Sequence, residues 1–321
     1  MMTWFDRAQA FSVFVSVFVG LILGQVAWLS ELAPSAIAPL LALMLYGTFL
    51  PLPLKHFGRG LKNSKVALAS LVTNFLWTPI FAWGLGAIFL PDSPDLWVGL
   101  IMLMVTPCTD WYLVFTGVAG GDVALATALL PLNLVLQVVL LPVYLLLLAG
   151  TLVELNPVRL FESVFWVLLI PLLMATISRQ LILWRKGSYW FEQRLSKVTI
   201  FQILCLNLAI VAIFVAEGYN LTQHPELFLK LLLPVVLFFV TNFLFALQIG
   251  QYLKFSYPEF ACFSCTTLAR NSPLSLAIAA TAFPHRPLIS LTLVIGPLIE
   301  LPIMVLVSQL LLRIRRTGQW Q

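Results

Sequence analysis

Charged residues are scarce in this sequence. Of its 321 residues 10% are charged and 61% are hydrophobic, and the mean hydropathy is +1.00. So little charge excludes an ordinary soluble domain. The apolar residues form runs of about 17 to 25, each long enough to cross a bilayer once. The sequence therefore predicts an all-α, polytopic membrane protein, and its Lys and Arg, which lie mostly in short loops, indicate membrane orientation instead of nucleic-acid binding.

Histidine and cysteine are also rare, with 3 His and 4 Cys in the chain. No His falls inside a predicted membrane segment, and no acidic residues pair there at a spacing suited to a metal. Cys262 and Cys265 have the spacing of half a zinc or redox motif, but no second pair of ligands accompanies them. We therefore expect a protein that is not an enzyme and has no catalytic residues, no metal site and no cofactor.

The apolar runs predict ten transmembrane helices. Their expected ranges are 10–29, 36–54, 66–90, 96–118, 123–149, 161–182, 195–216, 226–250, 257–283 and 287–312. Fourteen Lys and Arg fall on one face of the membrane and only Arg159, Lys230 and Arg286 on the other, so the positive-inside rule puts both termini in the cytoplasm. The chain is expected to be a multi-pass protein of the cell membrane whose first helix acts as an uncleaved insertion signal.

Short matches repeat along the chain at a nearly constant offset. The pentapeptide VTNFL at 72–76 recurs at 240–244, 168 residues farther on. Two proline matches have an offset of 166 residues: Pro107 with Pro273, and Pro131 with Pro297. These matches predict a duplicated structure.

The duplication divides the chain into two five-helix halves, 1–150 and 151–321, within a single membrane domain. Because five is odd, the second half must enter the membrane from the opposite side. Inverted repeats of this kind are typical of secondary transporters, in which corresponding broken helices meet near the middle of the bilayer and form the binding site.

The fourth and ninth spans are the expected broken, crossing helices. The fourth contains TPCTD at 106–110 and the ninth contains LARNSP at 268–273. In each, proline removes a backbone donor, and the polar neighbours would be costly in hydrocarbon unless they line a cavity. The predicted substrate-binding residues at these breaks are Cys108, Thr109, Asp110, Arg270, Asn271 and Ser272.

Glu300 is the strongest single candidate for a functional residue. It lies in the stretch GPLIELPIMVLVSQLLL, at 296–312, which contains no other charge. A carboxylate at membrane depth needs a partner or a proton. Two interpretations stay open: Glu300 is a proton carrier that couples transport, or it is a structural group paired permanently with Arg270.

Other polar groups add further alternatives. Asn133 and Gln137 are four residues apart in the fifth span, hence on one helix face, and could bind substrate, coordinate a coupling ion or join helices. Asp110 and Arg270 lie at the two breaks and could pair. Such a pair would keep the site neutral and suit an uncharged substrate, whereas an unpaired Arg270 would favour an anion.

The chain resembles the bile acid/sodium symporter superfamily and, within it, the arsenical-resistance permeases that export arsenite. The resemblance rests on TPCT at 106–109, GD at 121–122 and IGPLIELPIMVL at 295–306. It implies ten helices in two inverted halves with crossed, discontinuous fourth and ninth helices. It also implies that Cys108 and Glu300 are required for function.

The resemblance leads to a substrate hypothesis. Arsenite near neutral pH is an uncharged, thiophilic trihydroxide, and Cys108 would offer it one soft ligand. The expected function is export of arsenite, with antimonite as a second candidate substrate, in exchange for protons taken up by Glu300. The alternative is a sodium-coupled importer of an organic anion, with Arg270 binding the anion and oxygens supplied to Na⁺ by Asn133, Gln137, Asn271, Ser272 and Glu300. In either case the partners are a small inorganic or organic solute and the lipid bilayer.

Overall fold

The computed structural model describes residues 4–51, 64–109, 111–153, 156–223, 226–317 and 320. Within these residues the regular elements are all helices, joined by turns and short irregular segments, and no β-strand is present. The helices are, in chain order, α1 (Trp4–Leu23), α2 (Ala27–Phe49), α3 (Ser64–Val72), η3 (Thr73–Trp77), α4 (Thr78–Phe89), α5 (Pro94–Met104), α6 (Trp111–Val118), α7 (Val123–Tyr144), η4 (Leu145–Ala149), α8 (Pro157–Val164), η5 (Phe165–Leu169), α9 (Ile170–Glu192), α10 (Leu195–Gln223), α11 (Glu226–Tyr252), α12 (Tyr257–Leu268), α13 (Ser272–Ala282) and α14 (Pro287–Arg316). The elements η3, η4 and η5 are π-helical turns within longer helices.

The long helices have the composition of membrane spans. Seven stretches of the described chain are long and apolar enough to cross a bilayer, and α5 and α13 are shorter apolar helices. Large apolar side chains project from them, such as Ile88 and Leu147, which are 70% and 68% exposed. Exposure of such side chains to water is unfavourable, whereas contact with lipid tails is not. The multi-pass membrane class predicted from composition is thereby confirmed.

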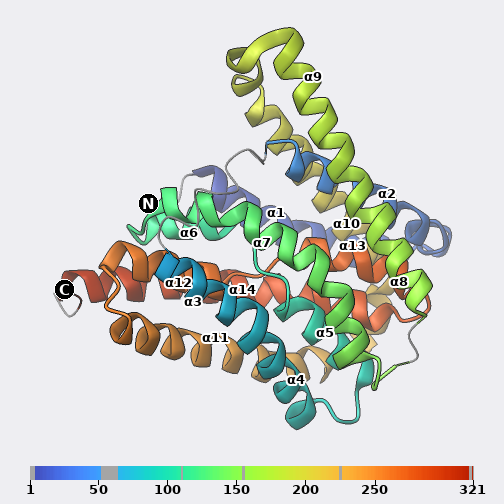
Figure 1. Cartoon of the computed structure of the whole chain (residues 1–321). Coiled ribbons are helices and arrows are strands. Elements are labelled where there is room, and N and C mark those ends of the chain that lie inside the picture. Colours follow the sequence, from blue (N-terminus) through green and yellow to red (C-terminus); the bar gives the residue numbers. More distant parts are fainter. Residues whose placement is uncertain are drawn as a thin grey trace.

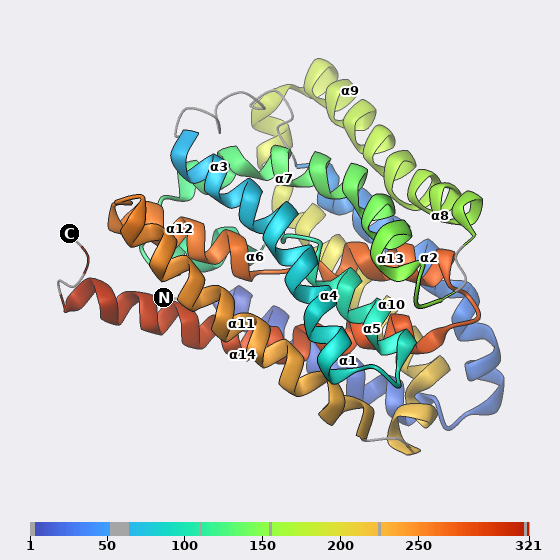
Figure 2. The ribbon, with the colours of Figure 1, turned by 60° about the horizontal axis from the view of Figure 1, so that its bottom comes forward.

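Two sets of helices pack around the centre of the molecule (Figures 1 and 2). In one, α10 packs along α1 and α2, and α2 also contacts α9, which extends away from the rest of the molecule in Figure 1. A Cβ at Gly20 would lie 2.5 Å from the Cβ of Phe214, so glycine lets α1 and α10 approach closely. In the other set, α14 packs on α5, α11 and α13, and α11 packs on α12.

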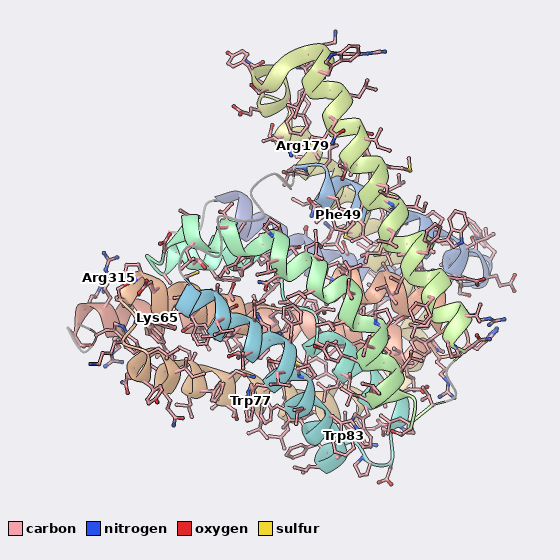
Figure 3. The ribbon with its side chains drawn as sticks, viewed as in Figure 1. Phe49, Lys65, Trp77, Trp83, Arg179 and Arg315 are labelled. Atoms are coloured by element: carbon pink, nitrogen blue, oxygen red, sulfur yellow. The ribbon has the colours of Figure 1, made fainter. Side chains whose placement is uncertain are left out.

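A proline shapes the continuous helix formed by α3, η3 and α4, along which Lys65, Trp77 and Trp83 are labelled in Figure 3. Pro79 has no N–H to donate to the carbonyl of Phe75, four residues earlier. The hydroxyl of Tyr144 on α7 donates to this carbonyl instead, at 2.5 Å. The bond ties α7 to η3, the π-helical turn that contains Asn74.

The observed helices show where the predicted boundaries need correction. The first two helices begin at Trp4 and Ala27, several residues before the predicted starts at 10 and 36. The predicted loop before 36 was too long, because α2 continues through Pro34 and Pro39, and packed membrane helices tolerate proline. The two predicted breaks are present, since α5 and α12 end before α6 and α13 begin. The count of ten crossings and their inverted arrangement stay predictions.

Candidate functional site

The two interrupted segments lie side by side and bond to each other through their backbones. The N–H of Cys108 donates to the carbonyl of Ala269 at 3.0 Å, and the N–H of Asn271 donates to the carbonyl of Thr106 at 2.8 Å. Together these bonds form a single antiparallel β-bridge. Each break therefore satisfies backbone groups that its own helices leave unpaired, as burial away from water requires. The predicted crossing point is thus a hydrogen-bonded unit.

Asn271 connects the break to the helix that follows it. Its Oδ1 accepts a hydrogen bond from the N–H of Leu274 at 3.3 Å and so caps the N-terminus of α13. Its Nδ2 donates to Oγ1 of Thr109 at 3.3 Å. One side chain therefore fixes both the start of α13 and its position relative to the opposite break.

Two hydroxyl groups continue this network between α5 and α13. Oγ of Ser275 and Oγ1 of Thr106 are 2.8 Å apart, and Ser275 also donates to the carbonyl of Met102 at 2.8 Å. Sequence analysis did not single out Ser275. It lies four residues after Asn271, so a polar residue repeating at helical spacing in an apolar helix was the signal that could have revealed it.

Glu300 reaches the crossing from α14. Its side chain is 5% exposed, and its Oε1 accepts a hydrogen bond from the backbone N–H of Arg270 at 2.8 Å. The peptide between Ala269 and Arg270 therefore contacts both key residues: its carbonyl binds the N–H of Cys108 and its N–H binds Glu300. In a trans peptide these two groups point in opposite directions. The backbone at Cys108 and the carboxylate thus lie on opposite edges of one peptide.

The guanidinium of Arg270 points away from this peptide into a shell of protein oxygens, and the residue is 3% exposed. Nη1 donates to the carbonyl of Met104 at 2.8 Å and Nε to that of Leu268 at 3.2 Å. Nη2 donates to the carbonyl of Thr267 and lies 3.4 Å from Oδ1 of Asn74. These acceptors hold the side chain in place. Its predicted alternative partner, Asp110, lies outside the described residues.

A small cavity opens beside Glu300, between the crossing and α10. The volume open to the centres of water molecules is about 60 Å³, enough for several waters. Its polar lining residues are Arg270, Ser272 and Glu300, and its apolar lining residues are Trp111, Leu206, Ile210, Pro273, Leu276, Leu293, Val294, Pro297 and Leu301. The cavity is therefore mainly apolar, with three polar residues in its lining.

The remaining predicted residues lie elsewhere. Cys108 is 5% exposed, is not in a disulfide, and is not among the described residues that line this cavity. Asn133 and Gln137 lie on α7, 1% and 0% exposed, and are likewise not among the lining residues. Within the described part of the chain, the amide N and O atoms of both have no hydrogen-bond partner. Buried amides without partners are unusual and mark a place where a water or an ion can be bound.

Comparison with known proteins finds a family and several relatives of this chain. The family model described as "Sodium Bile acid symporter family" matches residues 38–224. The chain is 30% identical over 248 residues to the arsenical-resistance protein Acr3 of Corynebacterium glutamicum, covering 74% of this chain and 67% of that protein. It is 26% identical over 340 residues to Acr3 of Alkaliphilus metalliredigens, covering 99% and 94% of the two chains.

A third relative has a different description. The uncharacterized sodium-dependent transporter YocS of Bacillus subtilis is 25% identical over 280 residues, covering 86% of this chain and 83% of its own. The matched family is one of membrane transporters, and its model covers more than half of this chain. The protein therefore belongs to the sodium bile acid symporter family, with arsenical-resistance proteins among its relatives.

Proposed function

We propose that the protein exports arsenite from the cell and takes up protons in exchange. The observation that carries this proposal is the carboxyl group of Glu300, buried beside a cavity of about 60 Å³. Two relatives described as arsenical-resistance proteins support the substrate class. Antimonite, a similar trihydroxide, belongs to the same proposal.

The size of the cavity favours a small solute. Pockets for drug-sized ligands have volumes of about 300 to 1,000 Å³. The cavity beside Glu300 offers about 60 Å³, room for a solute of a few heavy atoms. A molecule as large as a bile acid would require a much larger opening between α10 and α14. The apolar walls also favour an uncharged solute over an anion.

Glu300 is the proposed proton carrier. When the cavity faces the outside, a proton binds a carboxylate oxygen and the group becomes neutral. When the cavity faces the cytoplasm, the proton leaves and the charged carboxylate accepts the N–H of Arg270 more strongly than the neutral acid does. Because this N–H belongs to the broken segment, the proton changes the strength of a contact between α14 and the crossing. Such a contact can couple protonation to a change of conformation.

Cys108 has a separate proposed role as a soft ligand for arsenic. Its backbone lies across the Ala269–Arg270 peptide from Glu300, and it is not among the residues that line the cavity. Binding of substrate by the thiol therefore requires a second conformation in which the solute has passed this peptide. A single thiol suits transport, because three converging thiolates would hold the metalloid too tightly for release.

The same proposal includes the membrane arrangement. Ten helices form two inverted halves, 1–150 and 151–321. The protein spans the cell membrane, and both of its termini lie in the cytoplasm. The two backbone-paired breaks support this arrangement, because inverted-repeat transporters bring broken helices together. Cysteine labelling from each side of the membrane tests it, with one cysteine introduced beside Arg159 in the first turn of α8 and another in the loop that contains Lys254.

Transport in everted membrane vesicles tests the function. Vesicles with the wild-type protein should accumulate arsenite when a proton gradient is imposed, and cells that produce it should tolerate arsenite. Glu300→Gln should remove the dependence on the gradient, and Cys108→Ser should remove transport. Cys205→Ser is the matched control, since Cys205 is also buried but lies on α10. Full activity of Cys108→Ser would eliminate thiol coordination from the mechanism.

A second candidate function is sodium-coupled import of an organic anion. It is favoured by the unpartnered amides of Asn133 and Gln137, whose oxygens could hold Na⁺, and by the relative described as sodium-dependent. Replacement of sodium by choline distinguishes the two functions. Uptake of a carboxylate or sulfonate that stops in choline supports the importer, whereas arsenite transport that continues in choline supports the exporter.

A further inference from the structure

The guanidinium of Arg270 lies where two helices end. Met104 is the last residue of α5, and Thr267 and Leu268 are the last two residues of α12. The carbonyl oxygens of all three accept hydrogen bonds from the guanidinium. Carbonyls at a helix C-terminus lack intrahelical donors and carry the negative end of the helix dipole. The negative C-terminal ends of α5 and α12 thus face each other at the crossing, and the positively charged guanidinium of Arg270 lies between them.

The other neighbours of the guanidinium also suit a cation. Oδ1 of Asn74 is 3.4 Å from Nη2, and the ring of Phe238 has its centroid 5.0 Å from Cζ. Four neutral oxygens and a ring face therefore surround the charge. Carbonyls at the ends of broken helices are the groups with which transporters bind Na⁺ at the middle of the membrane. Here a side chain of the protein occupies that position.

The geometry also argues against a substrate anion on this arginine. Each of its three nitrogens has a protein oxygen within hydrogen-bonding reach. An anion would have to displace these acceptors, which would then lie buried without donors. A negatively charged group is already present near Arg270. It is the carboxylate of Glu300, which accepts a hydrogen bond from the backbone N–H of Arg270.

We propose that Arg270 is a tethered cation that occupies a monovalent-cation site at the crossing, so that the native protein binds no sodium there and transports without it. This inference deepens the proposed function, since it leaves the proton at Glu300 as the coupling ion. Removal of the guanidinium should leave an oxygen-lined space that accepts Na⁺.

Thermal unfolding of the purified protein in detergent tests the inference, with NaCl compared with choline chloride at the same ionic strength. Wild-type protein should melt at the same temperature in both salts. Arg270→Ala should melt at a lower temperature in choline, and Na⁺ at about 100 times its dissociation constant should raise its melting temperature by roughly 3 °C or more. Arg270→Lys is the matched control: it keeps a tethered charge and should not respond to sodium.

Saturable stabilisation of the wild type by Na⁺ would overturn the inference, as would a folded Arg270→Ala with identical melting in both salts. If Arg270→Ala does not fold, the measurements on the wild-type protein test the proposal by themselves. Its melting and its transport must both be unchanged when choline replaces sodium, and a sodium requirement in either refutes the proposal. If the protein does not transport arsenite but its variants melt as expected in the two salts, the proposed substrate is rejected. The inference that Arg270 is a tethered cation is then retained.

Discussion

The two interrupted segments at the centre of the molecule contribute different chemistry to one crossing. The described residues of the break after α5 are uncharged, and Thr106 and Cys108 bond across the crossing mainly through their backbones. The break after α12 contributes Arg270 and the capping side chain of Asn271. Among the described residues, the first segment therefore contributes mainly hydrogen bonds across the crossing, while the second contributes a buried positive charge and the residue that caps α13. Similar breaks need not share functions equally.

The largest expected effect concerns Glu300, which accepts the backbone N–H of Arg270 in the break after α12. Glu300→Ala leaves the N–H of Arg270 buried without its acceptor and removes the negative charge near the guanidinium. Loss of a charged acceptor from a buried backbone N–H costs about 1.5–3 kcal/mol. The variant should unfold at a much lower temperature or denaturant concentration than the wild type.

Glu300→Gln is the matched variant for this prediction. Its amide oxygen can still accept the N–H, so it should lose only about 1–2 kcal/mol. Equal losses in the two variants would show that the carboxylate does not act as an acceptor for the crossing. The comparison also separates stability from coupling, because Glu300→Gln should fold and yet fail to respond to a proton gradient.

The next prediction compares the two sides of a single hydrogen bond. Asn271→Ala removes the cap of α13 and the bond to Thr109, and should cost about 1–2 kcal/mol. Thr109→Ala removes only that bond and should cost about half as much. Chemical unfolding of the two variants measures the difference. If Thr109→Ala is the more damaging variant, the first segment does more than support the second.

A hydroxyl group on α13 gives a smaller effect. Ser275→Ala removes the bonds to Thr106 and Met102 and should cost about 1 kcal/mol. Thr281→Ala, farther along α13, removes a hydroxyl that bonds only within its own helix, to Ala277 and Ile278, and should cost less. Melting temperatures that do not differ between the variants would mean that Ser275 does not stabilise the crossing.

The sequence predicted the class of protein, the two breaks and several residues at the crossing, because each rests on a local signal. Apolar runs of fixed length predict spans, and proline beside polar residues predicts a break. The contacts of a side chain depend on helices far away in the sequence. Hence the acceptors of Arg270, at Met104 and Asn74, were not predictable, nor was the position of Cys108 outside the Glu300 cavity.

The smallest expected effect tests what maintains the break in the first segment. Pro107 is paired with Arg270 in the antiparallel bridge, and the two bonds of that bridge come from the residues on either side of Pro107. Its missing N–H therefore removes neither bond. Pro107→Ala should cost less than about 1 kcal/mol, chiefly through greater freedom of the unfolded chain.

Pro273→Ala is the control for Pro107→Ala, because proline in the first turn of α13 also replaces an N–H that the helix does not use. Both variants should retain arsenite transport and melt close to the wild type. A large loss for Pro107→Ala alone would mean that the missing N–H, and not the hydrogen bonds between the breaks, keeps α5 and α6 apart. The bonds to Ala269 and Asn271 would then be a consequence of the break and not its cause.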